Sequence, residues 1–196
     1  MEYLDIVNQD GLPTGEIISR AEAHKTGILH RTAHIWIVKP SSYGYDVLLQ
    51  KRSDNSESFP GMFDTSSAGH IPAGCEPIQS ALRELYEELG ITASENQLKY
   101  IGKMHISHED LFHGQEFRDN EITWLYVYNE PLNIDNLLLQ ETEVSEVRWF
   151  DIKKVWNAIC TQDEAFCVTK QGLEILMNYC YPQNKGERDD ENQRSI

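Results

Sequence analysis

The segment Gly69–Ile91, GHIPAGCEPIQSALRELYEELGI, contains the pattern that decides the fold. Apolar residues recur within it at the spacing of one helix face, from Ile78 to Leu89. Pro77 suits the first turn of such a helix, and Gly90 suits the left-handed residue that follows its last turn. The sequence therefore predicts a helix that is buried along one face and preceded by a glycine- and proline-containing loop.

Three glutamates occupy another face of the same predicted helix. Glu84, Glu87 and Glu88 are three and four residues apart or adjacent, so their side chains project together. Clustered carboxylates repel one another, and a cation that prefers oxygen ligands, such as Mg²⁺ or Mn²⁺, relieves that repulsion. A solvated acidic helix surface is the alternative interpretation. The preceding loop favours the cation site, because a loop that leads into a helix N-terminus can approach a phosphate closely.

The composition is that of a globular protein with an acidic bias. The 196 residues suffice for one domain, and the formal net charge is −15. This charge argues against a sequence-independent nucleic-acid binder and against docking on an anionic membrane. The N-terminal segment lacks the features of a signal peptide, and no apolar run is long enough to span a membrane. The four cysteines form no C-x-x-C pair, so we expect a reduced, cytoplasmic protein.

Gly69 and the run Arg83–Ile91 (RELYEELGI) stand at the spacing of a long, fixed motif, and together they resemble the Nudix box. Alternating strands and helices along the chain already favour an α/β fold, and the resemblance implies an α/β/α sandwich with a mixed β-sheet. It also implies a metal-dependent hydrolase, using Mg²⁺ or Mn²⁺, that cleaves a diphosphate linkage in a nucleoside diphosphate derivative or a related organic diphosphate. One box position differs, because Cys75 stands where the family has glutamate.

The same resemblance implies roles for individual residues of the box. Glu87 and Glu88 are expected to be metal ligands, and Glu84 is expected to be a metal ligand or a base acting on water. Arg83 is expected to orient a box carboxylate, and the carbonyl of Gly69 is a further metal ligand implied by the resemblance.

Features outside the box resemble one branch of this superfamily, the isopentenyl-diphosphate isomerases. The segments Phe59–Gly61, Ala68–His70 and Asp119–Glu121 are similar to elements of those enzymes. The isomerases have a cysteine that transfers protons at the position of Ala68, and alanine cannot transfer protons. The hydrolase is therefore the preferred interpretation. An isomerase-like enzyme and a non-catalytic Nudix-like ligand-binding module are the alternatives.

Further candidate site residues lie outside the box helix. The resemblance to the isomerases suggests that Glu121, at the start of a predicted strand, holds metal or activates water. Arg52 and Arg31 are candidates for binding the substrate phosphate. His70 is a third candidate substrate ligand, because it lies inside the box loop.

The remaining expectations concern organisation. We expect a single domain over residues 1–182 and a disordered polar tail over residues 183–196. A polar stretch over residues 108–120 is expected to form a surface loop. The expected partner is a small-molecule diphosphate, and a homodimer is compatible with the resemblance. Three histidines upstream of the box are expected to form structural hydrogen bonds, with metal ligation as the alternative: His24, His30 and His34.

Overall fold

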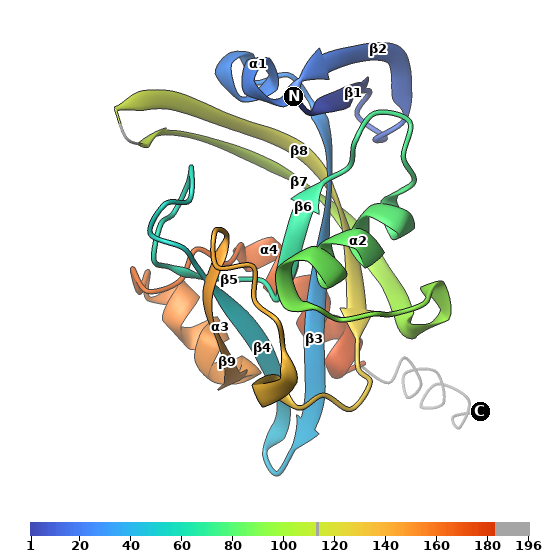
Figure 1. Cartoon of the computed structure of the whole chain (residues 1–196). Coiled ribbons are helices and arrows are strands. Elements are labelled where there is room, and N and C mark those ends of the chain that lie inside the picture. Colours follow the sequence, from blue (N-terminus) through green and yellow to red (C-terminus); the bar gives the residue numbers. More distant parts are fainter. Residues whose placement is uncertain (113, 183–196) are drawn as a thin grey trace, which may run out of the picture.

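The computed structural model describes residues 1–112 and 114–182 (Figure 1). Its strands are β1 (Tyr3–Val7), β2 (Pro13–Ser19), β3 (His30–Ser41), β4 (Gly44–Arg52), β5 (Phe63–Asp64), β6 (Ser67–His70), β7 (Leu98–Phe112), β8 (Gln115–Tyr128) and β9 (Val144–Asp151). Its helices are α1 (Arg20–Thr26), α2 (Pro77–Leu89), α3 (Ile152–Cys160) and α4 (Lys170–Cys180), with short 3₁₀ helices η1 (Glu95–Gln97) and η2 (Ile134–Asn136).

A mixed seven-stranded sheet forms the centre of the molecule. Its main path is β5-β4-β3-β8-β7, with β6 paired to β3 and β9 paired to β4. Strand β3 runs parallel to β8 and antiparallel to β4 and β6. The predicted α/β/α sandwich with a mixed β-sheet is therefore confirmed. The predicted tail, residues 183–196, lies outside the described residues.

Helices cover both faces of this sheet (Figure 1). Successive side chains of a strand point to opposite faces, and β3 follows this rule. Ile35 and Ile37 belong to a buried cluster with α2, whereas Trp36 and Val38 belong to a second cluster with α3 and α4. The middle of β3 is thus buried from both sides. Among the described residues, no helix is long and apolar enough to cross a membrane.

The box helix α2 has the ends that the sequence predicts. Pro77 is its first residue, and Gly90 follows its last turn in the left-handed conformation, with φ of 70°. Ala81, Leu85 and Leu89 are fully buried against the sheet. The apolar face of α2 therefore fixes the helix, and with it the direction of the box carboxylates.

The prediction of a surface loop over residues 108–120 is wrong. Residues 108–112 and 115–120 form the paired ends of β7 and β8, in which His108 is opposite Asp119 and Phe112 is opposite Gln115. The hairpin extends beyond the rest of the sheet (Figure 1), so few of its side chains need to be apolar. Backbone pairing and the left-handed turn residue Gly114, with φ of 77°, suffice to form it.

A buried ion pair ties the N-terminal hairpin β1–β2 to the loop before α2. Arg31 Nη2 donates to Asp5 Oδ2 at 2.6 Å, and both side chains are less than one-tenth exposed. The same nitrogen donates to the carbonyl of Cys75 at 3.1 Å, while Asp5 Oδ2 accepts the backbone N–H of Gly74 at 2.9 Å. Arg31 therefore connects β3, β1 and the box loop.

Replacing Arg31 by methionine would leave the Asp5 carboxylate buried without its partner. We expect Arg31→Met to lower the free energy of unfolding by about 3–5 kcal/mol in urea denaturation. Arg148→Met is the matched control, because the ion pair of Arg148 with Glu146 is exposed and its loss should cost less than about 1 kcal/mol. Equal losses in the two variants would contradict a structural role for Arg31.

Candidate functional site

A cavity of about 760 Å³ lies between β3, β6, the β7–β8 hairpin and the start of α4. Five of the predicted site residues line it: Arg52, Gly69, His70, Glu88 and Glu121. The other predicted residues, Arg31, Arg83, Glu84 and Glu87, are not among the lining residues. The structure therefore brings together residues from β6 in the box loop, from the box helix α2 and from two further strands, β4 and β8.

The box carboxylates differ in exposure. Glu84 and Glu88 are 8% and 3% exposed, whereas half of the Glu87 side chain is accessible to solvent. Glu88 Oε2 accepts the backbone N–H of Ala68 at 3.1 Å. Glu84 lies directly against Gly69, and a Cβ atom on Gly69 would overlap the Glu84 carboxyl group. Glycine is therefore required at this position for the carboxylate to reach β6.

The electrostatics of these buried carboxylates indicate a cation site. Burial raises the pKa of Glu84 to about 7, although the Arg83 guanidinium partly opposes the shift. Burial also raises the pKa of Glu88 to about 8, with the Ser67 hydroxyl opposing it. A divalent cation would provide the missing positive charge. Donors that are all oxygen atoms fit Mg²⁺ or Mn²⁺, so the residues present fit the metal that the box implies.

Arg83 lies where it can orient a box carboxylate. Its Nη2 donates to Glu84 Oε1 and, at 3.0 Å, to the carbonyl of His70. Its Nε lies 3.8 Å from Glu87 Oε2. Arg83 therefore contacts two of the three box carboxylates and the end of β6.

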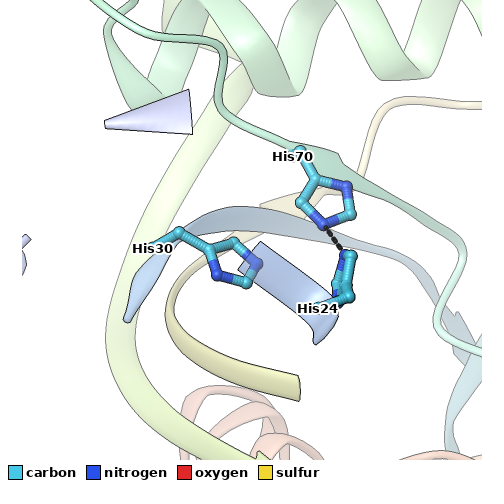
Figure 2. Close-up of side chains that lie close together, drawn as sticks. All are labelled: His24, His30 and His70. Carbon is cyan, nitrogen blue, oxygen red and sulfur yellow. Dashed lines mark hydrogen bonds between the residues drawn. The ribbon is translucent and has the colours of Figure 1, made fainter. Parts of the chain in front are cut away.

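A second group of potential ligands lies on the other side of β6, where three histidines point toward one another (Figure 2). His24 comes from α1, His30 from β3 and His70 from β6, and one ring nitrogen of each lies within 4.8 Å of the others. The Nε2 atoms of His24 and His70 are 3.0 Å apart. Figure 2 marks this contact with a dashed line. We call these three residues the histidine cluster.

His30 presents a free nitrogen to this cluster. Its Nδ1 donates to the carbonyl of Ile28 at 2.8 Å, which leaves Nε2 to face the cluster. Burial lowers the pKa of His30, but the nearby Glu121 carboxylate outweighs burial and raises it. Nε2 is buried and has no hydrogen-bond partner in the part of the chain that the structure describes. A buried polar nitrogen without a hydrogen bond is unfavourable, and a metal ion bound by the neutral ring would satisfy it.

Two carboxylates border the histidine cluster. Glu121 Oε1 lies 3.5 Å from His30 Nε2 and 3.7 Å from His70 Nε2, and Asp119 Oδ1 lies 3.1 Å from His24 Nδ1. Burial alone would raise the pKa of Glu121, but the neighbouring histidines outweigh it and lower the pKa to about 2. Burial lowers the pKa of His70 well below its usual range. An ionised carboxylate beside imidazole nitrogens suits a divalent transition ion such as Mn²⁺, Fe²⁺, Co²⁺ or Zn²⁺.

Two of the predicted phosphate ligands lie in different surroundings. Arg52 lines the cavity, where its Nη1 is 3.3 Å from Asp64 Oδ2 and its Nε donates to the carbonyl of Ser58 at 2.8 Å. Arg31 is held in the buried ion pair with Asp5 and does not line the cavity. We therefore assign Arg31 a structural role in place of a contact with substrate.

The sequence pattern did not single out the histidine cluster. Of the three upstream histidines, His24 and His30 join it and His34 does not, while His70 completes it. Asp119 belongs to the segment Asp119–Glu121 that the resemblance to the isomerases points to, but its contact with His24 is not predicted by the sequence. The usable signal was the spacing of Asp119 and Glu121, which places two carboxylates on one face of a strand.

The NUDIX domain model matches residues 28–170, which is more than half of the chain. This chain belongs to the Nudix family. The family assignment agrees with the box residues described above.

Two similar proteins are named Nudix hydrolases, and a third is named an isomerase. Nudix hydrolase 3 of Arabidopsis thaliana is 34% identical over 168 residues, which cover 84% of this chain and 21% of that protein. An uncharacterised Nudix hydrolase of Clostridium acetobutylicum is 39% identical over 143 residues, which cover 73% of this chain and 66% of that protein. The chain thus matches less than two thirds of the length of each. An isopentenyl-diphosphate isomerase of Dinoroseobacter shibae is 25% identical over 139 residues, or 69% of this chain and 71% of that enzyme.

A solved structure supports the fold. The crystal structure of DR0079 from Deinococcus radiodurans superposes with a TM-score of 0.67 at 17% identity, covering 92% of this chain and 99% of that one. At this identity the similarity shows the architecture alone.

The raised pKa values of Glu84 and Glu88 make the stability of the metal-free protein depend on pH. Between the ordinary carboxyl pKa of 4.5 and the folded values of about 7 and 8, the folded state keeps protons that the unfolded state has released. Raising the pH through this interval therefore favours unfolding, by up to about 3 kcal/mol for Glu84. We expect the melting temperature in chelator to fall from pH 5.5 to pH 8, and Mg²⁺ to restore it at pH 8.

Glu88→Gln provides the control for this experiment, because it removes one of the titrating carboxyl groups. The difference between wild type and Glu88→Gln isolates that group from the other titrating residues. A difference that does not change with pH would contradict a buried carboxyl of raised pKa.

The histidine cluster predicts a binding site for a transition ion. Co²⁺ added to the metal-free protein should produce visible absorption bands, because imidazole and carboxylate ligands replace its water ligands. His30→Ala should weaken this Co²⁺ binding by at least about tenfold. His105→Ala is the control, since His105 lies on β7 and contacts Asn120 instead of the cluster. Equal Co²⁺ binding by wild type and His30→Ala would contradict the site.

Proposed function

We propose that this protein is a metal-dependent Nudix hydrolase that cleaves a diphosphate linkage in a nucleoside diphosphate derivative or a related organic diphosphate. One observation carries the proposal: Glu84 and Glu88 are buried beside the cavity without enough positive charge to balance them. The family membership and the hydrolase names of the relatives support it.

Glu87 and Glu88, with the carbonyl of Gly69, would hold Mg²⁺ or Mn²⁺, and Glu84 would serve either as a further ligand or as the base for water. When bound, the ion supplies charge neutralisation at the phosphates and lowers the pKa of a water ligand. Arg83 holds Glu84 in place through its direct hydrogen bond. Arg52, at the cavity wall, is the candidate cation for a substrate phosphate.

Glu84 is better suited than Glu121 to accept a proton from water. A general base works best when its pKa lies near the operating pH, and the pKa of Glu84 is about 7. The pKa of Glu121 is about 2, because the adjacent histidines stabilise its charge. Glu121 Oε2 also accepts the Thr32 hydroxyl at 3.1 Å. We therefore propose that Glu121 supports the histidine cluster and that Glu84 acts on water.

A second metal site at the histidine cluster completes this proposal. His24, His30 and His70 would be the nitrogen ligands, with Glu121 as an oxygen ligand. Asp119 would orient His24 through the 3.1 Å contact with its Nδ1. Gly69 and Glu88 of the box line the same cavity as His24, His70 and Glu121, so a single substrate could contact both groups of ligands.

An isomerase of isopentenyl diphosphate is the second candidate, and the histidine cluster beside Glu121 is the observation that favours it. Ala68 argues against it, because its methyl group lines the cavity where proton transfer to carbon would require an acid or base. A non-catalytic ligand-binding module is disfavoured by the retained box carboxylates.

We further propose a cytoplasmic protein, with residues 1–182 as one domain, that acts on a small molecule.

A panel of diphosphates tests the hydrolase. Release of phosphate or nucleotide should require Mg²⁺ or Mn²⁺ for at least one compound among sugar nucleotides, dinucleotides, coenzymes, nucleoside triphosphates, thiamine diphosphate and isopentenyl diphosphate. Glu88→Gln should lower kcat/KM for that compound by about a hundredfold or more, because a metal ligand is lost. Glu95→Gln is the control, since Glu95 lies in η1 and contacts Gln79.

Two outcomes would overturn the hydrolase. One is hydrolysis that Glu88→Gln leaves unchanged. The other is formation of dimethylallyl diphosphate from isopentenyl diphosphate without hydrolysis of any compound, which would establish the isomerase.

A further inference from the structure

His34 is a cavity residue that neither group of metal ligands uses. It lies on β3, where Thr32 and His34 line the cavity while Ala33 and Ile35 are buried against α2. Within residues 1–112 and 114–182, the ring of His34 makes no hydrogen bond and no ion pair. Its imidazole is therefore available to a molecule in the cavity.

The neighbours of His34 on adjacent strands cannot bind its nitrogens. Ala68 is directly opposite it on β6, and Leu125 is directly opposite it on β8. Residues opposite one another in adjacent strands share a face of the sheet, so the Ala68 methyl group lies next to the ring. A polar side chain at residue 68 could have satisfied the imidazole, and alanine leaves that role to a ligand.

Charged groups surround the ring without bonding to it. The groups that act on it electrostatically are Asp64, Glu121 and Asp119, which favour the imidazolium, and Arg52, which opposes it. Burial outweighs these carboxylates and lowers the pKa of His34, so the ring is neutral at pH 7. A neutral imidazole has one donor and one acceptor nitrogen.

The chemistry of a neutral imidazole matches that of a hydroxyl group, which also donates and accepts. A hydrocarbon placed over the ring would keep water away and leave both nitrogens unpaired, which is unfavourable. Met104 and Ile106 of β7 also line the cavity and give apolar contact to either kind of group. His34 is therefore a lining residue whose contacts differ between a hydroxyl group and a hydrocarbon.

We propose that His34 is a specificity-determining residue that hydrogen-bonds a hydroxyl group on the organic part of the diphosphate substrate. The inference rests on the proposed function, because it assumes that the cavity takes a diphosphate. By this hydrogen bond, His34 would favour diphosphates linked to a hydroxylated group such as a sugar over diphosphates linked to a hydrocarbon. Sites that hydrogen-bond a substrate hydroxyl discriminate strongly against analogues without it.

Binding of two uncleavable, methylene-bridged diphosphates tests this inference. One is esterified with ribose through its 5-oxygen, and the other with cyclopentylmethanol, which has a similar ring without hydroxyl groups. Calorimetry with Mg²⁺ should show that wild type binds the ribose compound at least about tenfold more tightly. His34→Leu should bring the ratio of the two dissociation constants close to one by weakening the ribose compound alone. His34→Gln, which keeps a donor and an acceptor, should retain part of the preference.

The outcomes separate this inference from the proposed function. An unchanged ratio in His34→Leu, a preference of wild type for the cyclopentyl compound, or no binding of either compound would overturn the role of His34. Metal-dependent hydrolysis of the diphosphate panel would still establish the hydrolase in those cases. Conversely, a preference that depends on His34, without hydrolysis of any compound, would refute the hydrolase alone. His34→Phe, which keeps a ring without nitrogens, replaces His34→Leu if the leucine variant does not fold.

Discussion

The burial of Glu84 and Glu88 against strand β6 is the constraint on which the site depends. Two carboxylates in a low-dielectric environment are unfavourable unless a cation or hydrogen bonds compensate them. The helix that carries them is held by Leu85 and Leu89, which are fully buried. Glu84 and Glu88 each precede one of these leucines and lie on the same buried side of α2, so packing of that side brings both carboxylates against β6. Gly69 permits this contact because any side chain there would overlap Glu84.

Strand β6 connects the two groups of ligands. Gly69 is opposed by Glu84 on the α2 side, whereas His70 joins the histidine cluster. This separation follows from the alternation of side chains along a strand. The donors differ as well, since the box offers oxygen atoms and the histidine cluster offers nitrogen with carboxylate oxygen. Arg83 links them, because it donates both to Glu84 and to the carbonyl of His70. A change in the position of β6 would therefore affect both groups.

Local signals made α2 predictable, and non-local contacts made the rest of the site harder to predict. The apolar period of α2 and its terminal Pro77 and Gly90 are contained in one short segment. The histidine cluster combines α1, β3 and β6, so no spacing in the sequence shows it.

Arg31 looked like a phosphate ligand because its buried partner, Asp5, is 26 residues away. The β7–β8 hairpin was mistaken for a loop because its exposed strands lack the apolar alternation by which half-buried strands are recognised.

The position of Ala68 distinguishes the two enzyme chemistries that this framework could support. The histidine cluster and Glu121 are compatible with either a hydrolase or an isomerase, and so they do not discriminate between them. Proton transfer to carbon requires an acid or base beside the carbon atom, and Ala68 has neither. Attack of water on phosphorus requires no acid or base at residue 68, because the box carboxylates that would serve this reaction lie on the α2 side of β6. The methyl group of Ala68 instead leaves the His34 ring opposite it uncovered. The alanine that disfavours carbon chemistry thus also leaves the His34 imidazole available in the cavity, which is the basis of its proposed role in binding the organic part of a diphosphate.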